Sequence, residues 1–158
     1  MISKELEARI RRVEDIEEIK NLQAQYGYLI DTLQMEKVTE LFADEFIAEY
    51  LPSLGTFKTK KDLGEFLKGA GAGSGMMCHQ MMMPYIEVHG DKATATWYLF
   101  GPFISNLETG PCANWIQGKY QNDYVREGGK WKLKHLRFKF NLQSPYEEGW
   151  VKTRMMSP

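Results

Sequence analysis

The hydrophobic period of the chain changes once, and this change limits its fold more than any other feature. Before residue 69 the apolar residues recur at spacings of three and four, and the first run, from Leu6 through Ile19 to Leu29, forms one helical stripe. After residue 76 come four long segments rich in β-branched and aromatic residues. Helices followed by a long antiparallel meander predict an α+β domain with the helices on one face of a curved sheet.

The N-terminal stripe predicts one long helix, or two in tandem if Asp15 and Glu18 form a capping box. The GAGAGSG run at 69–75 predicts a flexible loop, and 105–114 a surface connection. Further helices are expected over 34–42 and 61–68, short strands over 46–50 and 56–58, and long strands over 77–88, 92–104, 113–126 and 130–142.

Length and charge narrow the class of protein. The 158 residues suit one domain, 1–158, with its core at about 13–150. Twenty Lys and Arg against twenty-one Asp and Glu leave no basic surplus for nucleic acid or an anionic membrane. The densely charged N-terminus is unlike a signal peptide, and the two cysteines have no metal-binding spacing. We expect a cytoplasmic protein.

Two residues could carry chemistry. Asp31 comes at the end of the first helix, where the negative pole of the helix disfavours a carboxylate, so it is either functional or a cap for the next helix. His79 shares an alternating strand face with three methionines, so it is either a neutral base or a core histidine. His135 is expected in the core or a pocket, and His89 in an exposed turn.

The other common catalytic patterns are missing from the sequence. Three histidines without paired spacing argue against a metal, and no G-x-S-x-G motif points to a nucleophile. We therefore expect neither a metal nor a cofactor. The tyrosines offer phenols that can hydrogen-bond a substrate oxygen.

Several phrases, in their order and spacing, resemble the SnoaL-like branch of the nuclear transport factor 2-like superfamily. They are DIEEIKNLQAQYGYLID, LFADEF, the Gly-rich break, H-x-x-x-x-P-x-I-E-V-x-G-D-x-A, GKYQNDYVREGGKWKL and SPYEEGW. The resemblance covers about Val13 to Trp150 and implies a cone-like α+β barrel. That fold hosts dehydratases, isomerases, cyclases, dehydrochlorinases and binding proteins.

The layout is most similar to the bile-acid dehydratases, with scytalone dehydratase and hexachlorocyclohexane dehydrochlorinase more distant. Members of this group use an Asp at the end of the first helix to orient a His on the facing strand, and Asp31 and His79 match these positions. Tyr26 and Tyr50 match tyrosines that line the dehydratase pocket, and Tyr120 matches less closely.

These observations together predict a cofactor-independent lyase of the dehydratase type, acting on an apolar ring compound with a carbonyl. His79 would be the general base and Asp31 would orient it. The alternatives are a double-bond isomerase or polyketide-type cyclase with the same base, and a non-catalytic small-molecule binder. Residues expected to contact the substrate are Tyr120, Met81, Met83, Trp97 and Trp115.

The C-terminal aromatic residues suggest a homo-oligomer. Pro145, Tyr146 and Trp150 have no periodic pattern that would bury them in their own chain. The resemblance favours a trimer over a dimer.

Overall fold

A computed structural model describes residues 3–52 and 54–156, which fold into four helices and a seven-stranded sheet. In chain order the elements are α1 (Lys4–Asp31), α2 (Met35–Thr39), β1 (Phe42–Leu51), β2 (Gly55–Phe57), α3 (Lys60–Ala72), β3 (Ser74–Met76), β4 (Gln80–His89), β5 (Lys92–Leu107), β6 (Gly110–Glu127), β7 (Lys130–Pro145) and α4 (Gly149–Lys152).

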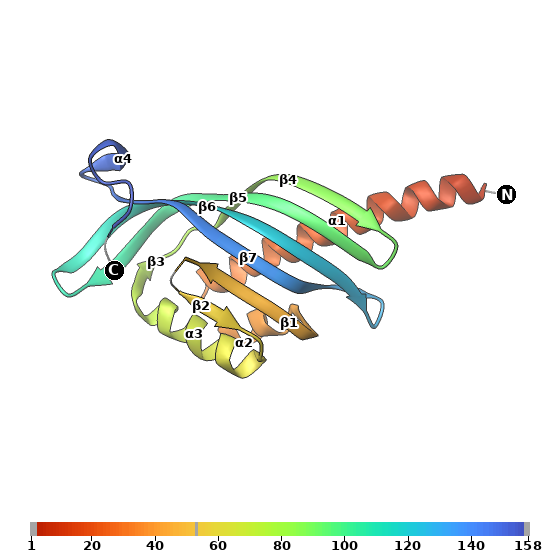
Figure 1. The fold of residues 1–158 in the computed structure, drawn as a ribbon, viewed down its shortest axis with the longest axis horizontal. Helices are drawn as coiled ribbons and strands as arrows, with labels where there is room; N and C mark the ends of the chain where they lie inside the picture. The colour runs from red at the N-terminus through yellow and green to blue at the C-terminus, as the bar shows by residue number, and fades with distance from the viewer. Residues whose placement is uncertain (1–2, 53, 157–158) are drawn as a thin grey trace.

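The strands lie in the order β2-β1-β7-β6-β5-β3, with β4 also paired to β5. Among these described strands, only the β1–β7 pair is parallel. The predicted α+β fold, with helices packed against a curved, mostly antiparallel sheet, is confirmed (Figure 1).

The N-terminal stripe forms one helix of 28 residues rather than two in tandem. Asp15 does not cap a second segment, because it is buried, forms an ion pair with Arg126 and accepts a hydrogen bond from Trp131 Nε1 at 3.3 Å. α1 runs across one face of the long strands, and its N-terminal end projects beyond the sheet (Figure 1). Within the described ranges, no helix is long and apolar enough to span a membrane.

Alternation along the long strands decides which side chains face the helices. In β5 the odd-numbered residues from Ala93 to Phe103 are buried, and in β6 the even-numbered residues from Asn114 to Tyr124 are. We call this the inner face of the sheet. The opposite, outer face carries the intervening residues.

Two predicted connections are regular structure instead. The Gly-rich run belongs mostly to α3, which continues to Ala72. A Cβ at Gly71 would lie only 2.9 Å from side-chain atoms of Leu33 and Met35, so the glycine lets the helix pack closely against these residues. The expected surface connection at 105–114 is formed by the extended ends of β5 and β6, which continue to Leu107 and from Gly110.

The strand predicted over 77–88 begins only at Gln80, so residues 77–79 form a link between β3 and β4. A Cβ at Gly101 would lie 1.8 Å from the carbonyl oxygen of Cys78, and one at Gly27 would lie 3.3 Å from Cβ and O of His79. Two glycines, one on β5 and one on α1, therefore let the link lie tightly between strand and helix.

Adding a methyl group at Gly101 should force this link away from β5. We expect Gly101→Ala to lower the free energy of unfolding by about 3 kcal/mol, the upper part of the range for overpacking. Gly69→Ala is the matched control: it lies in α3 with no described atom within 4 Å of the added Cβ, and should raise stability by about 0.5 kcal/mol. Urea unfolding measures both, and equal stability of Gly101→Ala and wild type would contradict the close approach.

Candidate active site

Asp31 ends α1, and its carboxylate binds His79 twice. Oδ2 accepts the backbone N–H of His79 at 2.9 Å, and Oδ1 lies 2.5 Å from the ring Nδ1. The last turn of α1 has no basic residue, so the negative end of the helix alone would disfavour this carboxylate. The backbone N–H and the ring N–H of His79 stabilise the Asp31 carboxylate against this unfavourable effect of the helix end.

The imidazole of His79 has a defined orientation. Since an ionised Asp31 can only accept hydrogen bonds, this contact favours the tautomer of the neutral imidazole that has its proton on Nδ1 and its lone pair on Nε2. The ring packs edge-on against Phe103, with 5.1 Å between ring centroids. The side chains of His79 and Asp31 are 11% and 20% exposed, so solvent reaches the pair. This arrangement can accept a proton from a bound molecule at Nε2.

Three tyrosines from three elements lie close together on the inner face. The hydroxyls of Tyr26 in α1 and Tyr50 in β1 are 2.8 Å apart, and the ring of Tyr120 in β6 meets that of Tyr26 edge-on at 5.9 Å. All three are buried. The structure thus brings together Tyr26, Tyr50 and Tyr120, the tyrosines selected from the sequence.

Burial makes these phenols weak acids. It is the largest cause of the raised pKa of each, and the neighbouring phenols Tyr120 and Tyr50 raise the pKa of Tyr26 further. For Tyr120, Tyr50 and the Asp31 carboxylate add to the rise in pKa, while the hydrogen bond with Tyr26 lowers it. The cluster is therefore neutral and offers O–H donors.

Of the other predicted contact residues, only Met81 lies beside the pair: its methyl group packs near Gly27, and its Sδ accepts from Gln23 Nε2 at 3.7 Å. Met83 points away, 73% exposed, because it has a positive φ at a register irregularity in β4. Trp115 lies on the outer face, stacked on Phe100 at 5.2 Å, because odd-numbered residues of β6 face outward there.

Trp97 is a core residue. It is buried on the inner face, and its Nε1 donates to the hydroxyl of Tyr124 at 3.0 Å. The expectation that it contacts a substrate is not supported by this enclosed position, in which its only side-chain donor already has an acceptor.

Asn114 is a further candidate site residue, which the sequence analysis does not identify. It is buried on the inner face and pairs across the sheet with Phe103, the residue that packs on His79. Its Nδ2 donates to Ser105 and to the carbonyl of Cys112, both at 3.1 Å, while Oδ1 has no hydrogen-bond partner among the described residues. Strand alternation with Tyr120 could have placed it on this face.

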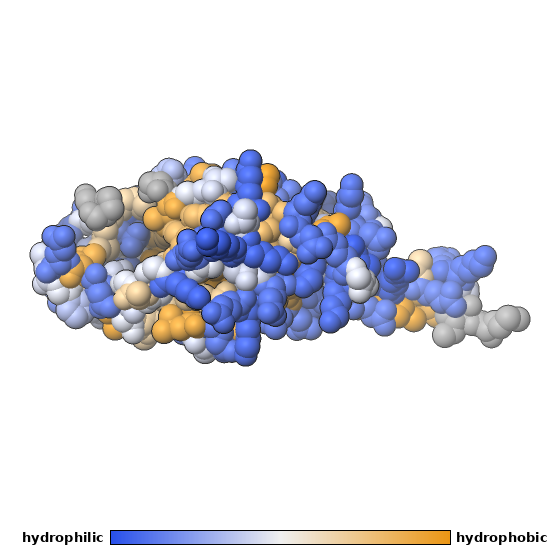
Figure 2. Space-filling view, turned by 90° about the horizontal axis from the view of Figure 1, so that it is seen from below, coloured by the Kyte–Doolittle hydropathy of each residue, from blue (hydrophilic) through white to orange (hydrophobic). Residues whose placement is uncertain are grey.

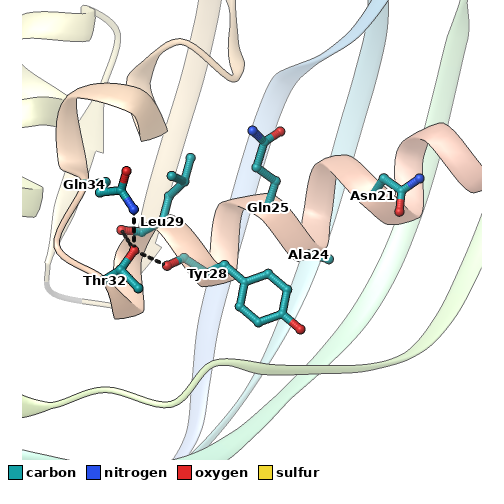
Figure 3. Close-up of a pocket in the computed structure, with 7 residues that line it drawn as sticks. All are labelled: Asn21, Ala24, Gln25, Tyr28, Leu29, Thr32 and Gln34. Atoms are coloured by element: carbon teal, nitrogen blue, oxygen red, sulfur yellow. Dashed lines mark hydrogen bonds between the residues drawn. The ribbon is translucent and has the colours of Figure 1, made fainter.

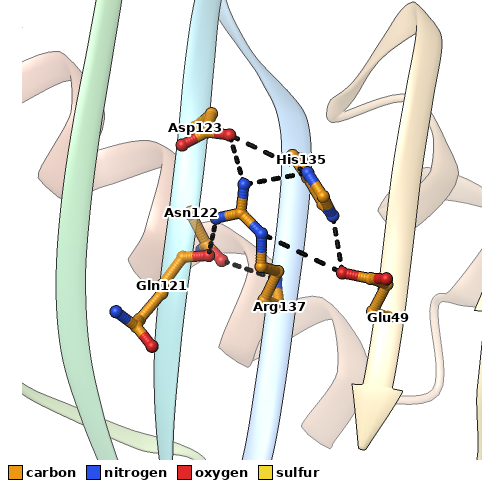
Figure 4. Close-up of polar contacts among 6 residues, drawn as sticks. All are labelled: Glu49, Gln121, Asn122, Asp123, His135 and Arg137. Carbon is orange, nitrogen blue, oxygen red and sulfur yellow. Dashed lines mark hydrogen bonds and ion pairs between the residues drawn. The ribbon is translucent and has the colours of Figure 1, made fainter.

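His135 lies on the outer face, so the expectation of core or pocket is wrong. A register shift in the β6–β7 pairing turns it outward, where its Nε2 lies 2.7 Å from Glu49 and its Nδ1 2.9 Å from Arg137 (Figure 4). Arg137 also donates to Asp123 at 2.6 Å. This half-exposed network of charges is separate from the pair on the inner face.

The surface hollows of the described chain do not lie at the Asp31–His79 pair. Two hollows of about 340 and 300 Å³ flank α1, and neither is lined by Asp31 or His79 (Figure 3). Across residues 3–52 and 54–156, no group of three or more His, Cys, Asp or Glu side chains is placed to hold a metal ion.

Solved structures share this fold. The type 3 hexachlorocyclohexane dehydrochlorinase LinA from Novosphingobium barchaimii LL02 matches with a TM-score of 0.77 and 18% identity, over 95% of this chain and 99% of that one. A candidate scytalone dehydratase from Novosphingobium aromaticivorans DSM 12444 matches with a TM-score of 0.76 and 18% identity, over 85% and 89% of the two chains. At such identities the likeness establishes the fold.

A comparison with curated protein sequences gives no match. The family model described as the SnoaL-like domain matches residues 11–137, which is most of the chain and includes both Asp31 and His79. The chain therefore belongs to the SnoaL-like domain family.

Proposed function

We propose that this protein is a cofactor-independent lyase that eliminates water from an apolar ring compound bearing a carbonyl. The observation that carries the proposal is the double hydrogen bond from His79 to Asp31, which leaves Nε2 available as an oriented base. The phenol cluster is close enough to this pair for the Asp31 carboxylate to raise the pKa of Tyr120. The related dehydrochlorinase and candidate scytalone dehydratase are named for eliminations, and this supports the same reaction class here.

The general base is His79. Its Nε2 would remove a proton from the carbon next to the substrate carbonyl, and the Asp31 carboxylate would stabilise the imidazolium that forms. A base of this kind contributes about 10²- to 10⁴-fold to the rate.

The phenols would bind the oxygen on which negative charge develops. The hydroxyl of Tyr26 interacts with those of Tyr50 and Tyr120, and a chain of three hydroxyls uses two of its O–H groups internally, so one O–H would remain to donate to a substrate oxygen. Donation along a chain of hydroxyls strengthens the outer donor. One such donor lowers the barrier by about 3 kcal/mol when it is aimed at the developing oxyanion.

The proposed step balances without an added reagent. The electrons of the broken C–H bond form the new C=C bond as the C–O bond to the leaving hydroxyl breaks. The imidazolium of His79 then returns its proton to the departing oxygen, so the products are the unsaturated ketone and water. The side chains end in their starting protonation states.

The surroundings of His79 favour an apolar substrate. Phe103 packs on the imidazole, Ile116 pairs with Gly101 beneath the link, and Met77 packs against the core. Apolar walls favour apolar ligands by about 25 cal/mol per Å² buried. The unpaired Oδ1 of Asn114 adds one acceptor that suits a substrate hydroxyl.

The cytoplasmic location and self-association expected from the sequence stay proposals. The free cysteines Cys78 and Cys112 are in keeping with a reducing compartment. Tyr146 and Trp150, the residues on which the expectation of a homo-oligomer rests, are exposed in the single chain.

Removing the base should slow elimination strongly while leaving the fold intact. With cyclic β-hydroxyketones of steroid, terpenoid and aromatic-polyketide size, we expect His79→Ala to lower kcat by about 10²- to 10⁴-fold. His89→Ala is the matched control, since His89 is exposed at the end of β4. Mass spectrometry detects the loss of water, whereas an isomerase would leave the product mass unchanged. Full activity of His79→Ala would contradict the proposal.

Ligand preference gives a second test. In a thermal-shift screen we expect micromolar binding and stabilisation by the apolar ketones, and none by nucleotides or free sugars, because the wall near His79 offers few donors for them. Stabilisation by the polar compounds alone would contradict the apolar substrate class. Binding of ketones without turnover of any would identify a binding protein instead.

A further inference from the structure

We propose that two copies of this chain pair through the solvent-facing side of α1, antiparallel and about a two-fold axis. In this arrangement the projecting N-terminal end of each α1 covers the hollow beside the C-terminal half of the other. The proposal rests on the pattern, exposure and charge of one helix and goes beyond the proposed reaction.

The solvent-facing side of α1 carries a second stripe with its own period. Its members recur at spacings of three and four residues and lie opposite the buried stripe that includes Ile19, Tyr26 and Ile30. The prediction of one stripe from Leu6 through Ile19 is therefore wrong, because Leu6 is exposed on the side of the helix away from Ile19. Residues that recur at alternating spacings of three and four form the contact stripe when two helices pack side by side. The stripe consists of Leu6, Ile10, Val13, Glu17, Lys20, Ala24 and Tyr28.

The N-terminal part of this stripe is apolar and has no cover in its own chain. Residues 4–14 are all exposed, including Leu6 and Ile10 at 44% and Val13 at 60%. Figure 2 shows this end of the molecule standing clear of the body. A short helical end gains most of its stability from packing, so an end held away from its own sheet points to an external partner.

The C-terminal part of the stripe provides a complementary surface. The hollow of about 340 Å³ runs along α1, and the ring of Tyr28, 73% exposed, projects beside it (Figure 3). None of the described residues that line it is charged, and Ala24, Leu29 and the ring of Tyr28 give it an apolar part that aliphatic side chains can cover. It is lined by Asn21, Ala24, Gln25, Tyr28, Leu29, Thr32 and Gln34.

The apolar N-terminal end of α1 and the hollow beside its C-terminal half fit a second copy of the chain that lies antiparallel to the first. The apolar end and the hollow lie at opposite ends of one helix, so one two-fold axis satisfies both pairs of surfaces at once. Near that axis lie Glu17 and Lys20, which form an ion pair of 2.6 Å within the chain. Antiparallel pairing would bring each Glu17 to the Lys20 of the second copy, whereas parallel pairing would bring like charges together.

This pairing has a consequence for the site and for the oligomer. Thr32, at the end of the hollow, directly follows Asp31, so the helix end of the second copy would lie next to the Asp31–His79 pair. Of the two oligomers left open by the sequence, a closed two-fold interface of this kind favours the dimer.

Light scattering after size exclusion tests the apolar contact. Wild type should have the mass of two chains, and Ile10→Glu that of one, with the dimer dissociation constant raised at least about 10-fold. Ala8→Glu is the matched control: it adds the same charge to the same projecting segment but on the opposite side, and should stay dimeric. Unchanged circular dichroism of Ile10→Glu would show that the fold is intact.

Charge reversal tests the antiparallel arrangement. Glu17→Lys and Lys20→Glu should each weaken the dimer, and the double reversal should restore it, because opposite charges then face each other again. A monomeric wild type, an Ile10→Glu protein with the same mass as wild type, or a double reversal as weak as the single ones would overturn the proposal.

Discussion

The double hydrogen bond between Asp31 and His79 fixes the part of the candidate site that lies outside the helices and strands. His79 lies in a link outside the sheet ladder, yet Asp31 holds its backbone N–H at 2.9 Å and its ring Nδ1 at 2.5 Å. Hydrogen bonds to a charged group contribute about 1.5–3 kcal/mol each. The unfavourable position of a carboxylate at the end of a helix costs about 1 kcal/mol or less. The two hydrogen bonds therefore more than offset the cost of placing the Asp31 carboxylate at the end of a helix. They also leave Nε2 of His79 free to act as a base.

This arrangement depends on where α1 lies relative to the sheet. One turn before Gly27, the buried Gln23 accepts hydrogen bonds from Asn122 Nδ2 at 3.0 Å and from the hydroxyl of Tyr124 at 2.8 Å. A buried amide left without these partners would cost about 1–3 kcal/mol, so the network holds the helix in one position on β6. From that position Gly27 admits the link and Asp31 reaches it.

The sequence predicts the order of elements because helical and strand periods differ clearly along this chain. Asp31 stands out because a carboxylate at a helix end breaks a local rule, but that rule alone also allows a capping role, and its pairing with His79 is expected only from the family resemblance. The faces of single residues are less predictable. One irregularity in β4 turns Met83 outward, and one in the β6–β7 pairing does the same for His135. A shift of one residue reverses every face that follows it, and no local pattern in the sequence marks these shifts. The link at His79 likewise depends on a contact with Gly101, a residue far along the chain.

The tautomer of His79 tests the central claim most directly. Long-range proton–nitrogen NMR correlation of the imidazole at a pH where it is neutral distinguishes the protonated ring nitrogen from the bare one. We expect a proton on Nδ1 and an unprotonated Nε2 in wild type, and loss of this preference in Asp31→Asn, whose amide can also donate. A proton on Nε2 in wild type, or the same tautomer in Asp31→Asn as in wild type, would contradict the claim that Asp31 orients His79 as a base.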